Sequence, residues 1–462
     1  MRLINRFFAS PTSRRAHEPF LCHLQGENIR PMKISHASLI DPDRNTLYVV
    51  PAIVLSLFVF AYSTRFGPIS ILAFYGVWLF PFALAPQTVL ARPGPVLFLL
   101  IVPTFFLFSM LWSDVPATTL RGSIQYGITV FAGLMAARIT SVPNLALGGT
   151  IGGLIILLYS AANGGYSYDY IDGDFAFNGA FSSKNQLGYY ATLTILFALS
   201  LIVVFKTQRL LIPLAAATAA LGAIMLWMSD SATSLLSAIG AFGAMGFMWA
   251  LLGLKPWLRR ATVFSVLTGC VAAIFGGYRA GAFDAVLGAF GRDASLTGRT
   301  YLWNEAITFG ADRPLLGLGY NAFWTHGRDA AEQLWQEFYI TARTGFHFHN
   351  LFIETYVAGG LIGLALIIVL SALLIALPLR AAIDRGNVAA LILFAGLSML
   401  FLIRSIAEVD FITAHTAGTF LVAYILLRLF DHHRDVRHAT HLSRPMLRPR
   451  HPSLGPAQGS VI

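Results

Sequence analysis

Long apolar segments separated by short polar ones dominate the chain from about residue 46 to residue 430. A helix that crosses a bilayer needs about 20 apolar residues, and about twelve segments approach that length. We expect them at residues 46–62, 67–86, 95–112, 120–139, 145–162, 187–205, 209–228, 232–253, 260–277, 351–378, 388–405 and 411–430. The pattern predicts an all-α polytopic membrane protein with about twelve transmembrane helices.

Two longer segments interrupt these spans, one at about residues 163–186 and the other at about residues 278–350. The second contains many large aromatic side chains, namely Tyr301, Trp303, Phe323, Trp324, Trp335, Phe338 and Tyr339. Polar linkers rarely carry so many of them. We therefore expect this long loop to form an ordered cap with one or more short helices at the membrane surface.

Positive charges indicate the orientation of the spans. Short Lys/Arg-rich connections occur as "KTQR" (206–209), "KPWLRR" (255–260) and "LRAAIDRG" (379–386). Cytoplasmic loops carry an excess of Lys and Arg. This places the long loop outside the cytoplasm, together with the histidines near residue 348. We expect a cytoplasmic tail at 1–45, a transmembrane domain at 46–430 and a basic cytoplasmic tail at 431–462.

Composition supports the membrane assignment and removes one alternative. Hydrophobic residues make up 56% of the 462 residues and charged residues only 12%, whereas average chains carry about 25% charged residues. Mean hydropathy is +0.66. The net charge of +10 lies in short loops and tails, so it fits membrane orientation and contact with membrane lipids better than nucleic-acid binding.

The first candidate site is "HFHN", which opens an apolar run. Asn350 is a good helix N-cap, and a helix that begins there leaves His347 and His349 outside it. His349 could then point into a cavity as a general base. Glu354 follows one turn inside the helix. The alternative is a structural pair of interfacial histidines with a helix cap. Two histidines without a third ligand do not predict a metal site.

The second candidate site is "GRDASLTGRTYLW", in the long loop. Arg299 and Trp303 are four residues apart and share a helix face, and Arg292 lies just upstream. A guanidinium fork matches phosphate oxygens, so this segment could bind phosphate at the membrane surface. The alternative is an arginine that anchors an interfacial helix.

The third candidate site is Lys184 with Asn185, at the start of a span on the extracytoplasmic side. Positive charge there runs against the orientation rule, and binding of an anionic head group would explain it. A lysine that reaches out to the interface is the alternative. A hydroxyl-rich turn at residues 229–234 is better explained by hydrogen bonds to the backbone between two spans.

Several motifs resemble one known family when they are read in order. They are "GAFSSKNQLGYYA", "SDSATSLLSA", "TGRTYLWNEAI", "RPLLGLGYNAFW" and "HFHNLFIETYVAGGLIGLAL". The chain resembles the O-antigen ligase/polymerase superfamily, and within it the exopolysaccharide polymerases of the succinoglycan-production type. The motifs cover roughly residues 170–380.

The resemblance implies a glycosyltransferase that works without metal or other cofactor in the bacterial inner membrane, with its active site facing the periplasm. Its donor would be a glycan on undecaprenyl diphosphate, and its acceptor another lipid-linked repeat unit. A chain-length regulator is a further candidate partner. His349 matches the family's base and Arg299 its diphosphate-binding arginine, with Arg292 and Lys184 as additional cations. His347, Asn350, Glu354, Asn185 and Trp303 would support them.

One departure and two alternatives accompany the resemblance. Many family members carry an arginine where this chain has Lys184, and lysine lacks the bidentate fork. A ligase that passes the glycan to lipid A–core would use the same donor. A transporter of the same lipid-linked glycan would carry ionisable residues near the middle of its spans and often repeated halves, whereas here the polar groups gather at one face.

Overall fold

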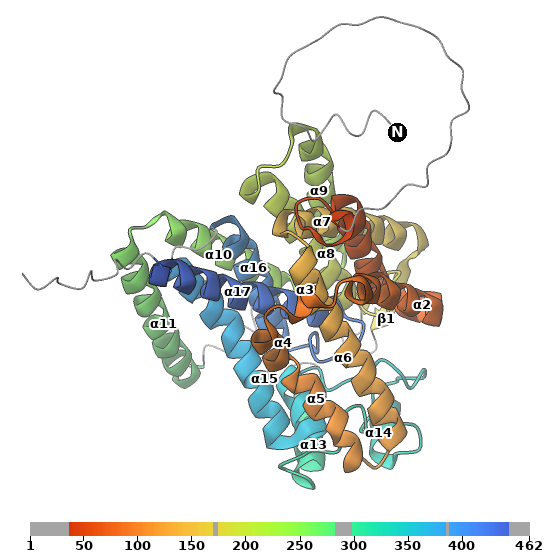
Figure 1. Ribbon diagram of the computed structural model, residues 1–462. Helices are drawn as coiled ribbons and strands as arrows, with labels where there is room; N and C mark the ends of the chain where they lie inside the picture. The colour runs from red at the N-terminus through yellow and green to blue at the C-terminus, as the bar shows by residue number, and fades with distance from the viewer. Residues whose placement is uncertain (1–36, 170–173, 282–297, 385–387, 443–462) are drawn as a thin grey trace, which may run out of the picture. The chain divides into compact units, whose positions relative to one another are not determined.

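The computed structural model describes residues 37–169, 174–281, 298–384 and 388–442, and α-helices make up most of them (Figure 1). The N-terminal half contains α1 (Ala37–Ile40), α2 (Thr46–Leu84), α3 (Gln87–Leu90), α4 (Pro93–Leu99), α5 (Ile101–Phe108), α6 (Pro116–Ile139), α7 (Val142–Asn163), α8 (Lys184–Leu199) and α9 (Ile212–Met228). The C-terminal half contains α10 (Ala232–Gly253), α11 (Pro256–Arg279), α13 (Arg299–Ala311), α14 (Asp329–Glu337), α15 (Leu351–Ile383), α16 (Val388–Arg404) and α17 (Ala417–Leu442).

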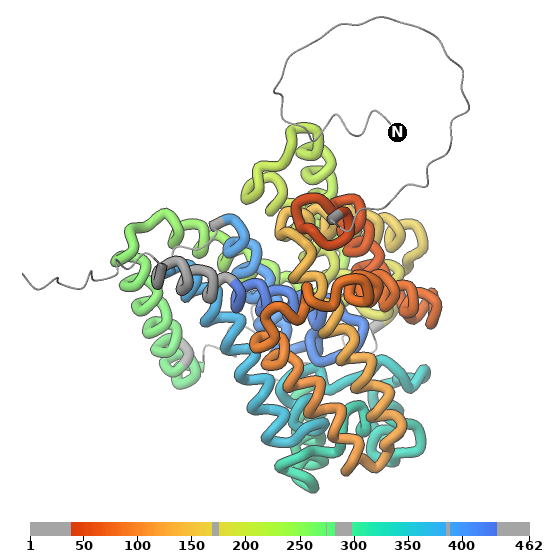
Figure 2. The backbone as a smooth tube through the Cα atoms, viewed as in Figure 1, coloured from red at the N-terminus to blue at the C-terminus, as the bar shows by residue number. Residues whose placement is uncertain are grey.

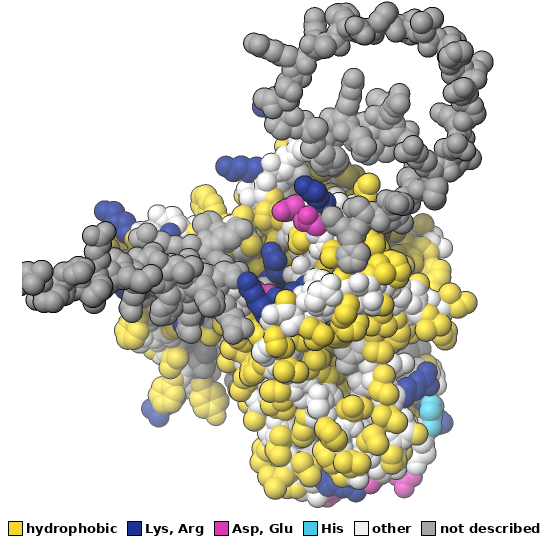
Figure 3. Space-filling view, viewed as in Figure 1, with side chains coloured by type: hydrophobic (Ala, Val, Ile, Leu, Met, Phe, Trp, Pro, Cys, Tyr) yellow, Lys and Arg dark blue, Asp and Glu magenta, His cyan; other side chains and the backbone are white. Residues whose placement is uncertain are grey.

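Seven of the described helices are long and apolar enough to cross a membrane, and eight if the bent pair α4–α5 counts as one span. They are α2, α7, α8 with its π-helical extension (Ser200–Val204), α9, α10, α11 and α15. The structure thus confirms an all-α polytopic membrane protein, while the expected count of twelve is not confirmed. On the face shown in Figure 3, apolar side chains form most of the described surface, as lipid contact requires.

Two expected spans, 46–62 and 67–86, form the single long helix α2, which changes direction between them (Figure 2). Tyr62 and Gly67 leave the helical conformation, and Gly67 has a φ of 67°. Pro68 follows Gly67, and a proline disfavours the α conformation of the residue before it. The expected span 95–112 is likewise divided, because α4 and α5 meet at an angle of 43°.

The short loop expected at about residues 163–186 contains an antiparallel hairpin of β1 (Gly165–Asp169) and β2 (Asp174–Gly179). Tyr166 pairs with Phe177 across the strands, and their ring centroids lie 5.3 Å apart. Cross-strand aromatic pairs of this kind stabilise a hairpin.

The described part of the long loop, residues 298–350, carries α13 and α14 and gathers at one end of the helical unit (Figures 1 and 2). It has its own apolar core, formed by Leu302, Ala306, Leu318, Ala322, Phe323, Ala331, Leu334, Trp335 and Phe348, with Val357 from α15. Helices α13 and α14 confirm the expected short helices, and their shared apolar core shows that the cap is ordered.

The "PLLGLG" turn of this cap, residues 314–319, inserts into a break in α15 at Gly360, whose φ is 61°. The backbone N–H groups of Leu318 and Gly319 donate to the carbonyls of Val357 and Ala358, at 2.9 and 3.0 Å. In the opposite direction, the N–H groups of Leu361 and Ile362 donate to the carbonyls of Pro314 and Leu315. A break in a helix leaves backbone N–H and C=O groups without their helical partners, and these hydrogen bonds replace them. The exchange fixes the cap against the helix that begins at the "HFHN" segment.

Candidate functional site

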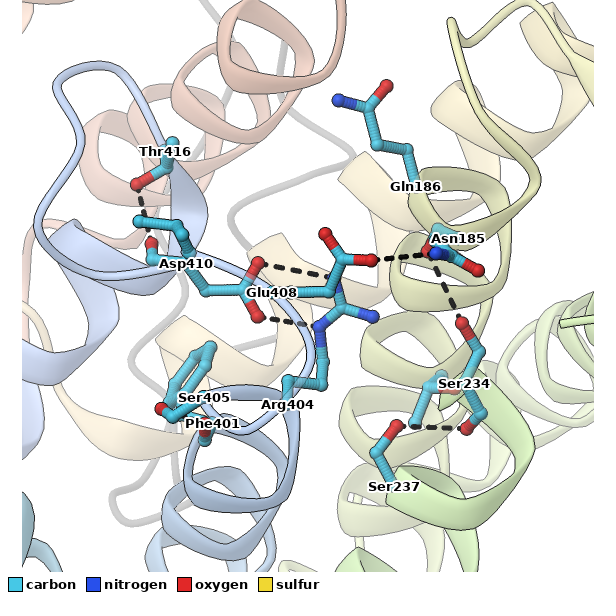
Figure 4. Close-up of polar contacts among 12 residues, drawn as sticks. Asn185, Gln186, Ser234, Ser237, Phe401, Arg404, Ser405, Glu408, Asp410 and Thr416 are labelled. Carbon is cyan, nitrogen blue, oxygen red and sulfur yellow. Dashed lines mark hydrogen bonds and ion pairs between the residues drawn. The ribbon is translucent and has the colours of Figure 1, made fainter. Parts of the chain in front are cut away.

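Glu408 lies at the centre of a polar cluster on the connection between α16 and α17. Its Oε1 accepts a hydrogen bond from Asn185 Nδ2 at 2.7 Å and lies 3.7 Å from Arg299 Nη2. Its Oε2 lies 3.6 Å from His347 Nε2 and 3.8 Å from His349 Nδ1. Figure 4 shows the Asn185 side of this cluster. Four segments that are far apart in the sequence therefore meet at one buried carboxylate.

The partners of Glu408 lie at, or just before, the N-terminal ends of three helices. Asn185 is the second residue of α8, Arg299 is the first residue of α13, and the two histidines precede α15. Ser231, the N-cap of α10, donates to Asn185 Oδ1 at 2.7 Å and so brings a fourth helix N-terminus close. Helix N-termini carry partial positive charge, which favours an anion near them.

Hydrogen bonds hold the "HFHN" segment in place. Asn350 caps α15 by accepting from two backbone N–H groups, as the sequence predicts, and its Nδ2 donates to the carbonyl of Ile406 at 3.1 Å. Trp303 Nε1 donates to the Phe348 carbonyl at 2.9 Å. Glu354 Oε2 accepts from the Phe348 N–H at 2.8 Å. Asn350, Trp303 and Glu354 thus position the histidines and lie outside the direct contacts of Glu408.

The two histidines differ in which nitrogen atoms are engaged. His347 Nδ1 accepts from the backbone N–H of His349 at 3.0 Å, and its Nε2 faces Glu408. His349 turns Nδ1 toward Glu408, but at 3.8 Å this nitrogen is buried without a hydrogen-bond partner among the described residues. His349 has a φ of 51°, an uncommon value for a residue other than glycine, and the ring centroids of the two histidines lie 4.3 Å apart.

Burial and the neighbouring positive groups shape the protonation of this cluster. Burial, together with His349 and two arginines, lowers the pKa of His347 to about 3, against the opposing attraction of Glu408. Burial by itself raises the pKa of Glu408, but His349, Arg404 and His347 outweigh it and hold that pKa well below its usual range. His347 is therefore neutral and Glu408 ionised near neutral pH.

Arg404, the last residue of α16, extends the cluster on the other side of Glu408. Its Nε and Nη2 donate to the two carboxylate oxygens of Asp410 at 2.6 and 3.2 Å, as Figure 4 shows. Its guanidinium carbon lies 4.4 Å from the ring centroid of Tyr189. The side chain is only 2% exposed, so this is a buried ion pair with a cation–π contact.

A cavity of about 450 Å³ adjoins the cluster. This is a typical volume for a small-molecule site. Its described wall contains residues of the cluster, aromatic side chains and hydroxyl groups; they include His347, Glu408, Arg404, Asp410, Gln186, Phe60, Tyr189, Tyr190, Tyr320, Trp324, Thr413 and Thr416. The polar cluster thus faces a space in which a ligand can bind.

The arrangement also brings together three groups that could bind a metal ion. One ligand atom from each of His347, His349 and Glu408 lies within 4.8 Å of the others. The sequence analysis saw only the two histidines and predicted no metal. Two features compete with a cation: Arg299 lies 3.7 Å from Glu408, and the side-chain amide of Asn185 already donates to the same carboxylate.

The structure therefore unites most of the residues predicted from the sequence. Asn185, Arg299, His347 and His349 surround Glu408, and Lys184 adjoins Asn185 at the start of α8. Arg292 lies outside the described residues. The hydroxyl-rich turn at 229–234 caps α10, as expected, and also contacts Asn185.

The sequence analysis missed Glu408, Arg404 and Asp410. A signal for them was present in "RSIAEVDF", where three charged residues fall between two apolar spans. That segment has the length of an ordinary connection, and only its contacts with α8, α13 and the "HFHN" segment distinguish it.

Chemically, an ionised carboxylate beside an imidazole can orient the ring and stabilise the imidazolium that forms when the ring takes a proton. With Glu408 beside Nδ1, His349 would accept a proton at Nε2. Arg299 and the helix N-termini supply positive charge that could stabilise a departing anion. The site thus combines a base with groups suited to an anionic leaving group.

Comparison with known proteins identifies relatives of the chain. Residues 217–368 match the family described as O-antigen ligase. The chain is also 41% identical over 402 residues to the exopolysaccharide production protein ExoQ of Rhizobium meliloti (strain 1021). That alignment covers 85% of this chain and 90% of the relative.

Proposed function

The chain belongs to the O-antigen ligase/polymerase superfamily, and we propose that it polymerises lipid-linked oligosaccharide repeat units into exopolysaccharide. In this proposal the donor is a glycan on undecaprenyl diphosphate, and the acceptor is the sugar of another lipid-linked repeat unit. The relationship to a protein named for exopolysaccharide production supports the pathway. It also supports action on lipid-linked glycans within a membrane.

The observation that carries the proposal is the convergence of His349, Arg299 and Asn185 on the buried carboxylate of Glu408. Glycosyl transfer from a diphosphate needs a base for the acceptor hydroxyl and positive charge for the leaving group. Both requirements meet within one cluster beside a cavity. A purely structural histidine pair would not require a buried carboxylate next to it.

In the proposed step, the acceptor hydroxyl oxygen forms a bond to the anomeric carbon of the donor sugar. The bond between that carbon and the diphosphate oxygen breaks, and undecaprenyl diphosphate leaves with the electron pair. The hydroxyl proton passes to His349 Nε2. Arg299 stabilises the charge on the leaving diphosphate, with Lys184 and Arg292 as further candidate cations. Attack opposite the leaving group inverts the anomeric carbon.

The position of the cluster along its helices supports a periplasmic active site. Helices α8, α10 and α15 each begin near the cluster, and a basic residue lies near the other end of each, namely Lys206, Lys255 and Arg380, respectively. Basic connections favour the cytoplasmic side. We therefore place the cluster at the outer face of the inner membrane, with both termini in the cytoplasm.

We propose that catalysis does not require a metal ion, although three groups could bind one. Arg299 supplies positive charge close to the carboxylate that a cation would need. The carboxylate also already accepts a hydrogen bond from Asn185. Arginines and helix N-termini can replace a divalent cation at a diphosphate because they stabilise the same negative charge.

Ligase activity is the nearest alternative, because the matching family is described as O-antigen ligase. To separate the two activities, the gene would be deleted in the source bacterium. The strain would then be complemented with wild type, His349→Ala or empty vector, and its surface and lipid-linked glycans fractionated by size. Membrane levels of each protein would be matched by immunoblot.

Loss of long chains, with single repeat units accumulating on the carrier lipid in both the deletion and the His349→Ala strain, is the result expected of a polymerase. Long chains that persist on the carrier lipid but fail to reach lipid A–core would show a ligase. Normal glycan in the His349→Ala strain at matched protein level would overturn the catalytic assignment. Repeat units trapped on the cytoplasmic face would show a transporter.

A further inference from the structure

The cavity beside the cluster offers little unpaired positive charge in its described wall. Arg404 is the one Lys or Arg residue of that wall, and its guanidinium already pairs with Asp410. Arg299 and Lys184, the described cations assigned to the diphosphate, are not part of this wall. A diphosphate would therefore find no unpaired guanidinium or ammonium in the described wall, whereas an uncharged ligand needs none.

The rest of the described wall suits a sugar. Phe60 and Tyr189 offer aromatic faces, Thr413 and Thr416 offer hydroxyl groups, and Gln186 offers an amide. Small-molecule sites combine apolar and aromatic surface with a few placed polar groups that fix orientation. A sugar has both an apolar ring face and hydroxyl groups around its edge, so it matches both parts of this wall.

Arg404 has an unmet capacity to donate hydrogen bonds. Two of its nitrogens are held by Asp410, but Nη1 is buried and has no partner among the described residues. In Figure 4 this third nitrogen has no contact drawn to it. A buried donor without a partner is unfavourable, and a ligand hydroxyl in the adjoining cavity would remove that cost.

We propose that this cavity binds a neutral sugar of the acceptor glycan, and that Arg404 donates from Nη1 to one of its hydroxyl groups. The inference rests on the proposed glycosyl transfer and adds which substrate occupies which side of the cluster. The acceptor sugar lies against Arg404, next to His347 and Glu408, while the donor diphosphate lies on the side of Arg299. Arg404 is thus a residue that determines acceptor specificity.

The test measures binding without turnover. The His349→Ala protein is the reference, and every further variant is made in that background and purified in lipid nanodiscs. The probe is a size-fractionated neutral oligosaccharide obtained by partial hydrolysis of the source bacterium's exopolysaccharide, and its affinity is measured by isothermal titration calorimetry. Arg404→Lys keeps the charge beside Asp410 but loses the fork. It should weaken oligosaccharide binding about tenfold or more, because charged hydrogen bonds to ligands are among the stronger ones.

A second variant avoids disturbing the buried ion pair. Gln186 is exposed and lies in the cavity wall, so Gln186→Met should fold normally and weaken oligosaccharide binding by a few fold. Arg313→Lys is the matched control, because Arg313 also pairs with an aspartate, Asp114, but lies outside the described cavity wall. It should leave binding unchanged.

Undecaprenyl diphosphate is the second probe and distinguishes the two substrates. Arg299→Lys should weaken its binding and spare the oligosaccharide, whereas Arg404→Lys should do the reverse. Loss of undecaprenyl diphosphate binding in Arg404→Lys, with oligosaccharide binding intact, would show that the cavity holds the donor head group and would overturn the proposal. Unchanged oligosaccharide affinity in both Arg404→Lys and Gln186→Met would overturn it too. These binding results are independent of whether the wild-type enzyme polymerises or ligates.

Discussion

His349 Nδ1 lies 3.8 Å from Glu408 Oε2, which is too long for a hydrogen bond, and this nitrogen is buried without a hydrogen-bond partner in the described part of the chain. The negative charge of the nearby carboxylate favours the tautomer with the proton on Nδ1, so that Nε2 can accept a proton. The histidine is proposed as the base, and Glu408 as the residue that orients it.

Replacing Glu408 by glutamine should lower kcat about 100-fold or more with a smaller effect on KM. Glutamine retains the size of the side chain and an oxygen for Asn185. Its amide could instead donate to His349 Nδ1 and favour the tautomer that cannot accept at Nε2. The rate of glycan elongation in proteoliposomes measures the effect.

Glu332→Gln provides the control for Glu408→Gln. Glu332 also pairs with an arginine, Arg343, at 3.1 Å, but it lies on α14 in the cap. This variant should elongate glycan at the wild-type rate. A Glu408→Gln rate within about threefold of wild type would rule out the orienting role.

Chelation should leave elongation unchanged. If Arg299 and the helix N-termini supply the positive charge, EDTA dialysis should alter neither the rate nor the length of the product. Metal content of the dialysed protein would be checked by mass spectrometry. Loss of activity that Zn²⁺, Mg²⁺ or Mn²⁺ restores would instead assign His347, His349 and Glu408 as metal ligands.

Gly360→Ala should destabilise the protein strongly. Gly360 has a φ of 61°, and an added Cβ would lie 2.3 Å from the carbonyl carbon of Leu315 in the inserted turn. The backbone strain alone costs about 1–3 kcal/mol. We expect a lower midpoint of thermal unfolding in detergent, measured by fluorescence-detected size-exclusion chromatography.

Gly243→Ala is the matched control for Gly360→Ala. Gly243 lies in α10, and an added Cβ there would meet nothing within 4 Å. Its thermal midpoint should equal or slightly exceed that of wild type, because alanine is favoured over glycine within helices. Equal midpoints for the two variants would contradict the interlock between the turn and α15.

Stability should fall as the pH falls from about 7 to 5. His347 has a pKa lowered to about 3 and His415 one lowered to about 4, both chiefly through burial. An unfolded histidine titrates near pH 6.5, so below that pH the unfolded chain binds protons that the folded chain does not. Each group can remove at most about 1.4 kcal/mol per pH unit in this window.

His347→Gln should make stability less dependent on pH between 7 and 5, and a further change of His415 should reduce the dependence again. Glu408 is excluded as a cause in this range because its pKa is lowered and it stays ionised. Unfolding midpoints at several pH values would measure the slope. An unchanged slope in the double variant would show that these histidines are not the groups responsible.

Local sequence patterns predicted much of the fold because hydropathy is a local property. The span expected at 232–253 is α10 to the residue, and Asn350 caps α15 as its residue type suggested. The junction of two expected spans into α2 and the break at Gly360 were not predictable in this way. The break depends on backbone hydrogen bonds to the turn at residues 314–319. This turn lies about 40 residues earlier in the chain, so the pattern around Gly360 does not indicate the contact.

The candidate site shows the same division. His349 and Arg299 were predicted from residue type and from the family resemblance, and the structure brings both to Glu408. Glu408 itself was missed because nothing in its own segment indicates contact with Asn185, which is 223 residues away in the chain. A buried carboxylate acquires its role from its partners, and those are set by tertiary packing.

The most direct test of the central claim is elongation of isolated lipid-linked repeat units by purified protein in proteoliposomes. Wild type should convert single units into long chains, His347→Gln should do so about tenfold more slowly, and His349→Gln should lose at least about 100-fold of the rate. All three proteins would be matched for their thermal midpoint. Elongation by His349→Gln at the wild-type rate, or none by wild type, would contradict the account.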